Sequence, residues 1–303
     1  MDNPPPPIFL AGPTAAGKSA LALELAGLLG GEIVSVDSMQ VYRGMEIGTA
    51  KPSAADQRRA RHHLIDVADL DQSFDAAQFV RLAAAAVRDI QGRGRRPIFC
   101  GGTGLYFKAY LEGLGEAPPR DPEVRAQLEA APLSELLDEL QRADPATFAV
   151  IDRQNPRRVI RALEVIRLSG RPFSGQRARW ETAPRQTARV IGLTRPAGEL
   201  VERIHQRVEE MFGRGLVAET ESLLRRGLER NPTAMQALGY RQVVEHLRGE
   251  RGLAETIDLV KIRTRQFAKR QLTWFRRQMR LEWIAPSDAT PAKLAETLAG
   301  SVF

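Results

Sequence analysis

The sequence has a single cysteine, Cys100, and no apolar run long enough to cross a membrane. One cysteine excludes the internal disulfide framework that stabilises many small secreted domains. A transmembrane helix needs about 20 consecutive apolar residues, which the chain never reaches. The first residues, Met1 to Pro7, are acidic and rich in proline, whereas a secretory signal is basic and then apolar. We therefore expect a cytoplasmic protein that does not contact a membrane.

Internal repeats and low-complexity tracts are also lacking, apart from the prolines at positions 4–7. The 303 residues are 43% hydrophobic and 27% charged, so the chain can bury a proper core. This composition excludes wholesale disorder, and the length leaves room for two domains.

Charge is unevenly distributed along the chain. Residues 1–150 hold 15 Lys and Arg against 20 Asp and Glu, a net charge of −5. Residues 151–303 hold 29 against 17, a net charge of +12. An acidic half joined to a basic half suggests a catalytic part and a part that binds a polyanion. The alternative is an arginine-rich composition with solvated basic faces.

The first hundred residues alternate between strand and helix patterns. Apolar strands are predicted at 8–10, 32–36 and 97–100, and helices at 19–29 and 74–90. This alternation predicts an α/β fold, with a P-loop NTPase-like parallel sheet and helices on both faces. Functional groups at the carboxyl ends of the strands then converge on one crevice.

The pattern changes after Pro118-Pro119, where the sequence becomes helical and charged up to about residue 180. An apolar strand returns at 189–193 and further helical segments follow. We therefore predict a catalytic core formed by residues 1–117 and 188–303, which ends in C-terminal helices. Residues 118–187 are predicted to form a helical insertion domain.

Residues 12–19, Gly-Pro-Thr-Ala-Ala-Gly-Lys-Ser, match the P-loop spacing between a strand and a helix. Its glycines let backbone N–H groups point at an anion, and the helix dipole adds to that attraction. Lys18 supplies a positive charge, and the Ser19 hydroxyl suits a phosphate-bound Mg²⁺. The motif predicts a diphosphate or triphosphate ligand without distinguishing the two.

Asp37 ends the second predicted strand, near this loop. Such a carboxylate can coordinate Mg²⁺, accept a proton from a nucleophile, or cap the strand end. The Gly101-Gly102-Thr103-Gly104 turn can bring backbone amides or a hydroxyl to the same crevice, although glycine pairs at strand ends are common. The pair His62-His63 lacks further ligands at metal spacing, which favours a structural role. Cys100 is predicted to be a small core residue.

The basic half contains three clusters of cations. Arg157, Arg158 and Arg161 open a helix, and Arg203 and Arg207 share a helix face at i, i+4. The third cluster covers 261–280, where one helical stripe is predicted to contain Lys261, Arg265, Lys269, Arg276 and Arg280. Trp274 and Phe275 interleave with it, which suits base stacking on RNA, although both aromatic rings can equally be core residues.

Three functions are compatible with a P-loop and a basic half: a small-molecule kinase, a nucleic-acid ATPase, and a transferase whose acceptor is RNA. The sequence lacks a convincing Walker B strand, which disfavours the ATPase. A fourth, non-enzymatic alternative is an RNA-binding module with a nucleotide switch.

Seven segments resemble the tRNA dimethylallyltransferase family, also called the IPP transferases, over nearly the whole chain. The Asp-Ser-x-Gln and Thr-Ala-Lys-Pro pieces are more specific than the P-loop. The segments are 12–19 (GPTAAGKS), 36–52 (VDSMQVYRGMEIGTAKP), 62–66 (HHLID), 101–106 (GGTGLY), 155–165 (NPRRVIRALEV), 236–241 (QALGYR) and 264–276 (TRQFAKRQLTWFR).

The resemblance implies transfer of a dimethylallyl group from dimethylallyl diphosphate to the exocyclic amine of the adenosine 3′ to the anticodon of a tRNA. The implied catalytic residues are Thr14, Lys18, Asp37 and Arg207, with Asp37 as the base. Mg²⁺ is the implied cofactor, held partly by Ser19. The implied diphosphate-binding residues are Gly12, Thr14, Ala15, Ala16, Gly17, Lys18 and Ser19.

The implied partner is the anticodon stem-loop of tRNA, and we expect the protein to act as a monomer. The residues implied to contact tRNA are Asp37, Ser38, Met39, Gln40, Thr103, Arg125, Arg157, Arg158, Arg161, Gln236, Gly239, Tyr240, Arg241, Lys269, Arg270, Gln271, Thr273, Trp274 and Arg276.

Overall fold

A computed structural model describes residues 4–176, 188–286 and 289–302 of the chain. The chain divides into two compact units, one of residues 1–111 and 184–303 and one of residues 112–183. The sequence placed the insertion at 118–187. In the structure the second unit begins earlier, at residue 112, because the helix after the fourth strand ends at Glu112 and the chain leaves the core there.

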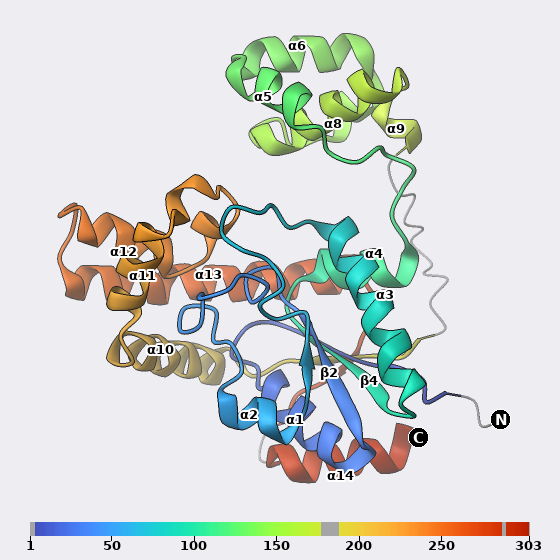
Figure 1. Cartoon of the computed structure of the whole chain (residues 1–303), viewed down its shortest axis with the longest axis vertical. Helices are drawn as coiled ribbons and strands as arrows, with labels where there is room; N and C mark the ends of the chain where they lie inside the picture. The colour runs from blue at the N-terminus through green and yellow to red at the C-terminus, as the bar shows by residue number, and fades with distance from the viewer. Residues whose placement is uncertain (1–3, 177–187, 287–288, 303) are drawn as a thin grey trace. The chain divides into compact units, whose positions relative to one another are not determined.

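The core is a six-stranded, fully parallel sheet in the order β3-β2-β4-β1-β5-β6 (Figure 1). Its strands are β1 (Ile8–Ala11), β2 (Gly31–Val36), β3 (His62–His63), β4 (Arg96–Gly101), β5 (Val190–Leu193) and β6 (Glu282–Ile284).

Helices cover both faces of this sheet, as the sequence predicted. The core helices are α1 (Lys18–Leu29), α2 (Ala54–Arg59), α3 (Ala76–Gly92), α4 (Gly104–Glu112), α10 (Ala197–Gly213), α11 (Leu216–Arg225), α12 (Tyr240–Leu247), α13 (Leu253–Gln278) and α14 (Pro291–Val302). Two 3₁₀ turns, η1 (Leu228–Arg230) and η2 (Ala234–Gln236), connect α11 to α12.

The alternation of side chains along β1 explains why the core has two layers. Ile8 and Leu10 point to the face covered by α1 and α14, whereas Phe9 and Ala11 point to the face covered by α3. Because both faces are buried, the strand reads as a continuous apolar run rather than an alternating one. Each buried aliphatic or aromatic side chain contributes about 1.5–3 kcal/mol of transfer free energy.

The strand order places three loops side by side at the carboxyl edge of the sheet. β4 lies between β1 and β2, and all three strands run in the same direction. The P-loop follows β1, Asp37 follows β2, and the Gly101-Gly102 turn follows β4. The crevice expected from the sequence therefore forms at this edge.

The second unit is a bundle of short helices: α5 (Pro122–Ala130), α6 (Leu133–Ala143), α7 (Pro145–Val150), α8 (Pro156–Ser169) and α9 (Phe173–Gln176). Its own hydrophobic core includes Leu128, Leu136, Leu140, Val159 and Leu163. Buried Glu164 accepts a hydrogen bond from the backbone of Asp121 at the start of α5 (3.1 Å). Across the residues that the structure describes, no helix has the length and apolar character of a membrane span.

A candidate active site at the carboxyl edge of the sheet

The P-loop joins the buried end of β1 to the first turn of α1. Gly17 adopts a φ of 100° at the position before the helix, a conformation that favours glycine. The backbone turns there without a side chain in the way, and the helix N-terminus opens toward a cavity of about 820 Å³. Thr14, Ala15, Gly17, Lys18 and Ser19 all line this cavity. Gly12 and Ala16 of the same motif are buried and shape the loop.

Lys18 is buried, and its Nζ donates to the carbonyl of Pro13 in the same loop (2.6 Å). Burial lowers the pKa of Lys18 to about 8, with the nearby cation of Arg207 acting in the same direction and the charge of Asp37 opposing it. A buried ammonium with one carbonyl partner gains much from an anion placed beside it. This setting favours binding of a diphosphate.

Two cations of α10 reach the same cavity. Arg203 and Arg207 both line it, which confirms that they share a helix face. The Nε of Arg203 donates to the carbonyl of Ala15 in the P-loop (2.9 Å). Arg207 is half-buried, and burial lowers its pKa while the charge of Asp37 raises it. The structure thus brings Asp37 and Arg207 into electrostatic contact.

The Asp37 carboxylate lines the cavity together with Lys18. Its Oδ1 accepts backbone hydrogen bonds from Met39 (2.8 Å) and Gln40 (3.2 Å), so it also terminates the strand in the way that a cap does. These bonds fix the orientation of the carboxylate and leave its second oxygen available to the cavity.

The turn after β4 is tied to its neighbours by side-chain hydrogen bonds. The Thr103 hydroxyl accepts from the backbone of Ser38 (3.2 Å). Gln271 of α13 accepts from the backbone N–H of Thr14 (2.9 Å) and donates to the carbonyl of Gly102 (2.9 Å). Gln271, implied by resemblance to contact tRNA, therefore has its amide engaged in joining the P-loop to this turn. The ring of Trp274 packs so closely on Gly104 that an added Cβ would lie 2.1 Å from it.

Helix α13 presents a different face to the cavity from the stripe predicted from its cations. Val260, Thr264, Phe267, Arg270 and Gln271 line the cavity. The basic stripe lies elsewhere: Lys261 forms an ion pair with Glu209 (2.8 Å), Arg265, Lys269 and Arg276 are exposed, and Arg280 lies beyond the end of the helix.

The two aromatic residues of α13 differ in environment. Phe275 is fully buried and packs edge-on against Phe107 (6.1 Å between centroids), so it is a core residue and not a stacking platform for bases. Trp274 is only partly buried, while Thr273 on the same helix is exposed.

The segment 236–241 contributes unequally to the cavity. Gln236 lines it, whereas Gly239 is the N-cap of α12 and is not among the lining residues. The Tyr240 side chain is fully buried and donates to Glu219 (2.7 Å). We therefore assign Tyr240 a structural role in place of the direct RNA contact that the resemblance implied. Arg241 is exposed and pairs with Glu245 (3.2 Å).

Glu219 of α11 is a structural residue that the sequence did not single out. Its carboxylate accepts from the backbone N–H groups of Glu46 (3.2 Å), Ile47 (2.9 Å) and Gly48 (3.4 Å) as well as from Tyr240. Three consecutive amides converging on one carboxylate hold this loop against α11. No spacing pattern indicates such a contact, because its partners lie far apart in the sequence.

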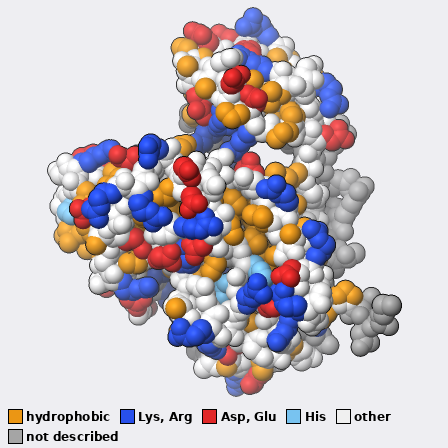
Figure 2. Space-filling model, viewed as in Figure 1, with side chains coloured by type: hydrophobic (Ala, Val, Ile, Leu, Met, Phe, Trp, Pro, Cys, Tyr) orange, Lys and Arg blue, Asp and Glu red, His pale blue; other side chains and the backbone are white. Residues whose placement is uncertain are grey.

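On the face shown in Figure 2, basic and acidic side chains are intermixed over the part of the core that contains α11 and α12. Three arginines in and just after α12 form ion pairs: Arg241 and Arg251 contact Glu245, and Arg248 contacts Glu229. The net positive charge of the second half therefore does not make this face uniformly basic.

The four predicted RNA-contacting arginines of the insertion lie in the second unit. Arg161 donates to Glu164 (2.8 Å) and to the carbonyl of Pro118 (2.6 Å). Arg125 pairs with Glu129 (2.8 Å). Burial lowers the pKa of Arg157, and the nearby cation of Arg125 adds to the effect. Arg158 is exposed. Arg125 and Arg161 thus stabilise the unit through these contacts.

The remaining reactive side chains have structural partners. His63 contacts Glu32 (2.7 Å), which also binds Arg93 (2.8 Å). Cys100 is buried in β4 as predicted, and burial raises the pKa of its thiol to about 11. Within the described ranges, no cluster of three or more His, Cys, Asp or Glu could hold a metal without help from a ligand.

Comparisons with known proteins agree on one family. The model of the IPP transferase family matches residues 40–278. A "tRNA dimethylallyltransferase" of Desulforudis audaxviator is 44% identical to this chain, and the match covers 100% of this chain and 99% of that protein. The "tRNA dimethylallyltransferase" of Corynebacterium diphtheriae is 43% identical to this chain, and the match covers 96% of this chain and 97% of that protein.

Solved structures give the same result. The tRNA isopentenylpyrophosphate transferase of Bacillus halodurans has a TM-score of 0.71 and 39% identity, covering 98% of this chain and 96% of its own. A eukaryotic dimethylallyltransferase solved in snapshots of its action on tRNA has a TM-score of 0.76 and 25% identity, covering 98% of this chain and 76% of its own. With a P-loop, a carboxylate and two arginines around one cavity, and with relatives matching over its full length, this chain belongs to the IPP transferase family, the family of the tRNA dimethylallyltransferases.

Proposed function

We propose that the protein transfers the dimethylallyl group of dimethylallyl diphosphate to the exocyclic amine of the adenosine 3′ to a tRNA anticodon, giving N6-dimethylallyladenosine and diphosphate. The observation that carries this proposal is the single cavity lined by Lys18, Asp37 and Arg207. In this one cavity, the donor diphosphate would meet an anion site and the acceptor amine would meet a carboxylate. The full-length relatives named for this activity support it, and nothing favours a small-molecule kinase.

The donor diphosphate binds at the P-loop. Its oxygens accept hydrogen bonds from the loop amides at the start of α1, and Lys18 and Arg207 stabilise the negative charge that grows on the leaving diphosphate. Burial desolvates Lys18 and, in part, Arg207, so both cations interact strongly with an anion.

Asp37 acts as the general base. The adenine amine attacks the allylic carbon of the donor, a C–N bond forms, and the C–O bond to diphosphate breaks. The amine proton becomes acidic only as the new bond forms, so a carboxylate placed beside it can accept it. The two backbone bonds to Oδ1 hold the carboxylate in one orientation while this happens. Thr14 lines the same cavity, and we propose that it lies beside the reacting groups.

The residues present fit a Mg²⁺ ion that is bound mainly through the substrate. Mg²⁺ usually takes one or two protein oxygens and completes its shell with phosphates and water. The Ser19 hydroxyl on the cavity wall can supply one such oxygen, which leaves the Asp37 carboxylate to act as the base. When bound, the ion would neutralise charge on the diphosphate.

The acceptor adenine must leave the stacked anticodon loop to enter the cavity, which costs a few kcal/mol. Contacts to the RNA backbone offset that cost. The residues that we propose for them are Ser38, Met39, Thr103, Gln236 and Arg270, which line the cavity, Arg241, Lys269, Thr273 and Arg276, which are exposed, and the half-buried Trp274. Arg157 and Arg158 of the second unit are proposed to add phosphate contacts.

Incubation with Mg²⁺, dimethylallyl diphosphate and unmodified tRNA, followed by digestion to nucleosides and mass spectrometry, tests the proposal. We expect N6-dimethylallyladenosine, with ATP unable to replace the donor. Phosphorylation of a small molecule by ATP, or tRNA binding without any product, would overturn it.

A further inference from the structure

The segment from Asp37 to Lys51 connects β2 to the turn before α2 and supplies seven residues to the cavity wall: Asp37, Ser38, Met39, Gln40, Gly48, Thr49 and Ala50. As the structure describes it, this 37–51 segment contains turns but no helix, and its strand pairing is limited to a bridge between Tyr42 and Ala68. An irregular segment lacks the repeating backbone bonds that fix a helix or a strand. The two backbone N–H groups that bind Asp37 are therefore held in place by single turn hydrogen bonds and by side-chain contacts.

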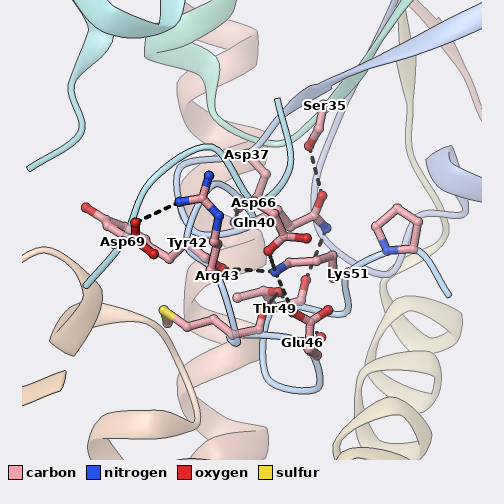
Figure 3. A network of polar contacts seen from close by, with 12 residues as sticks. Ser35, Asp37, Gln40, Tyr42, Arg43, Glu46, Thr49, Lys51, Asp66 and Asp69 are labelled. Atoms are coloured by element: carbon pink, nitrogen blue, oxygen red, sulfur yellow. Dashed lines mark hydrogen bonds and ion pairs between the residues drawn. The ribbon is translucent and has the colours of Figure 1, made fainter. Parts of the chain in front are cut away.

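Lys51, at the end of this segment, has a side chain with no exposed surface. Its Nζ donates to the carbonyl of Tyr42 (2.9 Å) and to the carboxylates of Glu46 (2.8 Å) and Asp66 (2.5 Å), as Figure 3 shows. An ammonium has three donors, and all three are used inside the molecule. Lys51 can therefore contact neither the RNA nor the diphosphate directly.

A chain of hydrogen bonds leads from Lys51 to Asp37 through Gln40. The backbone N–H of Asp66, whose carboxylate binds Lys51, donates to the carbonyl of Gln40 (3.1 Å). The Gln40 amide donates to the carbonyls of Thr49 (3.2 Å) and Ala50 (3.3 Å), next to Lys51 in the chain. The backbone of Gln40 in turn donates to the Asp37 carboxylate (3.2 Å).

The carbonyl oxygen of the Gln40 side-chain amide is bound to the sheet. Its Oε1 accepts from the hydroxyl of Ser35 in β2 (2.8 Å), and Figure 3 shows the Gln40 side chain between Ser35 and the turn at Thr49. Gln40 thus transmits any displacement of the Lys51 end of the segment to the residue that orients Asp37.

We propose that Lys51 is a positioning residue for the general base Asp37. Its ammonium closes the 37–51 segment into one arrangement, and through Asp66 and Gln40 it holds the carboxylate facing the anion site. The inference rests on the proposed function. Loss of Lys51 frees two carboxylates that are partly exposed, 47% for Glu46 and 38% for Asp66, so water can solvate them. The segment then loosens locally while the P-loop keeps its own contacts.

The test is a double-mutant cycle between Lys51→Met, which keeps the length of the side chain and removes its charge, and Asp37→Ala. Single-turnover transfer is measured with saturating donor and tRNA, and pyrophosphate affinity is measured separately. We expect Lys51→Met to slow transfer by about tenfold or more, because small misplacements of reacting groups are costly. Pyrophosphate affinity should stay within about twofold. In the Asp37→Ala background, Lys51→Met should change the residual rate by less than about twofold.

Glu32→Gln is the matched control, because it breaks another buried ionic contact at the opposite end of β2 and lines no part of the cavity. It should lower thermal stability and leave the saturated transfer rate within about twofold. If Lys51→Met does not fold, Asp66→Asn removes one partner of the ammonium at a half-exposed position and should slow transfer in the same Asp37-dependent way.

An equal loss of rate with and without Asp37 would overturn the inference, as would an unchanged rate in Lys51→Met and Asp66→Asn. These failures differ from failure of the proposed function, in which the unaltered protein itself yields no prenylated adenosine.

Discussion

Asp37 combines two roles that sequence patterns treat as alternatives. It accepts two backbone hydrogen bonds, which is the work of a cap, and it lines the same cavity as the P-loop lysine. The cap fixes the direction of the carboxylate, so the structural role serves the chemical one. For this residue the two interpretations are therefore compatible.

Replacing Asp37 with Ala should lower the single-turnover rate by about 10²- to 10⁴-fold, the usual contribution of a general base. Binding of tRNA, measured by filter retention or fluorescence anisotropy, should change little because many other residues are proposed to contact the RNA. Weakened tRNA binding with normal residual chemistry would contradict the assignment of the base.

The lowered pKa of Lys18 predicts that binding of the donor depends on pH. Its pKa in the empty site is lowered to about 8, and a bound anion favours the charged form. The ammonium is therefore fully present below pH 8 and is lost as the pH rises above it, so the Kd for pyrophosphate should increase above about pH 8. Isothermal titration across pH 7–9.5 measures this increase.

Pyrophosphate also titrates in this range, so the control is Lys18→Ala, which keeps the ligand's own pH dependence. Identical slopes for the two proteins would show that Lys18 keeps its proton throughout the range.

At the scale of elements, the two helices and the longer strands of the core were found within two residues of their predicted bounds, whereas the two shortest strands were not predicted. The predictions of α1, β2, β4 and β5 are confirmed within one or two residues. The predicted helix at 74–90 begins instead at Ala76, because Asp75 accepts from the N–H groups of Ala77 and Gln78 and caps it. The two-residue β3 and three-residue β6 are too short for any periodicity, and only pairing with their neighbours defines them.

Helix α13 shows why charge spacing alone misjudges a binding face. The spacing grouped Lys261 with Lys269 and Arg276, yet Lys261 pairs with Glu209 and Arg270 faces the cavity. Which cations remain free depends on the acidic residues that other helices bring alongside, and the sequence of one helix does not contain that information.

Changing Lys269, Arg270 and Arg276 together to Ala should weaken tRNA binding and flatten its dependence on salt. Each lost phosphate contact lowers the slope of log Kd against log salt by about 0.7–0.9, so the slope should fall by about two to three. Binding titrations at several salt concentrations measure it. Arg81→Ala with Arg88→Ala, two exposed positions on α3, is the control and should leave the slope unchanged. An unaltered slope in the triple variant would remove these three residues from the interface.

At the scale of the whole molecule, the residues of the anion site all belong to one of the two units, and none belongs to the insertion. Every residue that lines the 820 Å³ cavity belongs to the unit of residues 1–111 and 184–303. The second unit has its own hydrophobic core and its own buried Glu164 network. The proposed diphosphate site is therefore built by the first unit alone.

Replacing residues 112–183 with a flexible glycine–serine linker should leave pyrophosphate affinity within about twofold, because no lining residue is removed. Binding of tRNA should weaken, since the proposed phosphate contacts of Arg157 and Arg158 are lost. Isothermal titration with pyrophosphate and anisotropy with tRNA measure the two effects. Loss of pyrophosphate binding in a folded variant would show that the insertion helps to form the anion site.

The sequence by itself determined the parallel α/β core, the P-loop, Asp37 at a strand end and the family, because these depend on local spacing and short-range periodicity. The tertiary structure decided which side chains share the cavity, which cations are already paired, and how the 37–51 segment is held. Gln271, Glu219 and Lys51 acquire their roles from partners that lie close only after folding, such as Thr14 for Gln271 and Gly48 for Glu219. Contacts of this kind leave no spacing in the sequence, since a hydrogen bond depends on distance in space and not on separation along the chain.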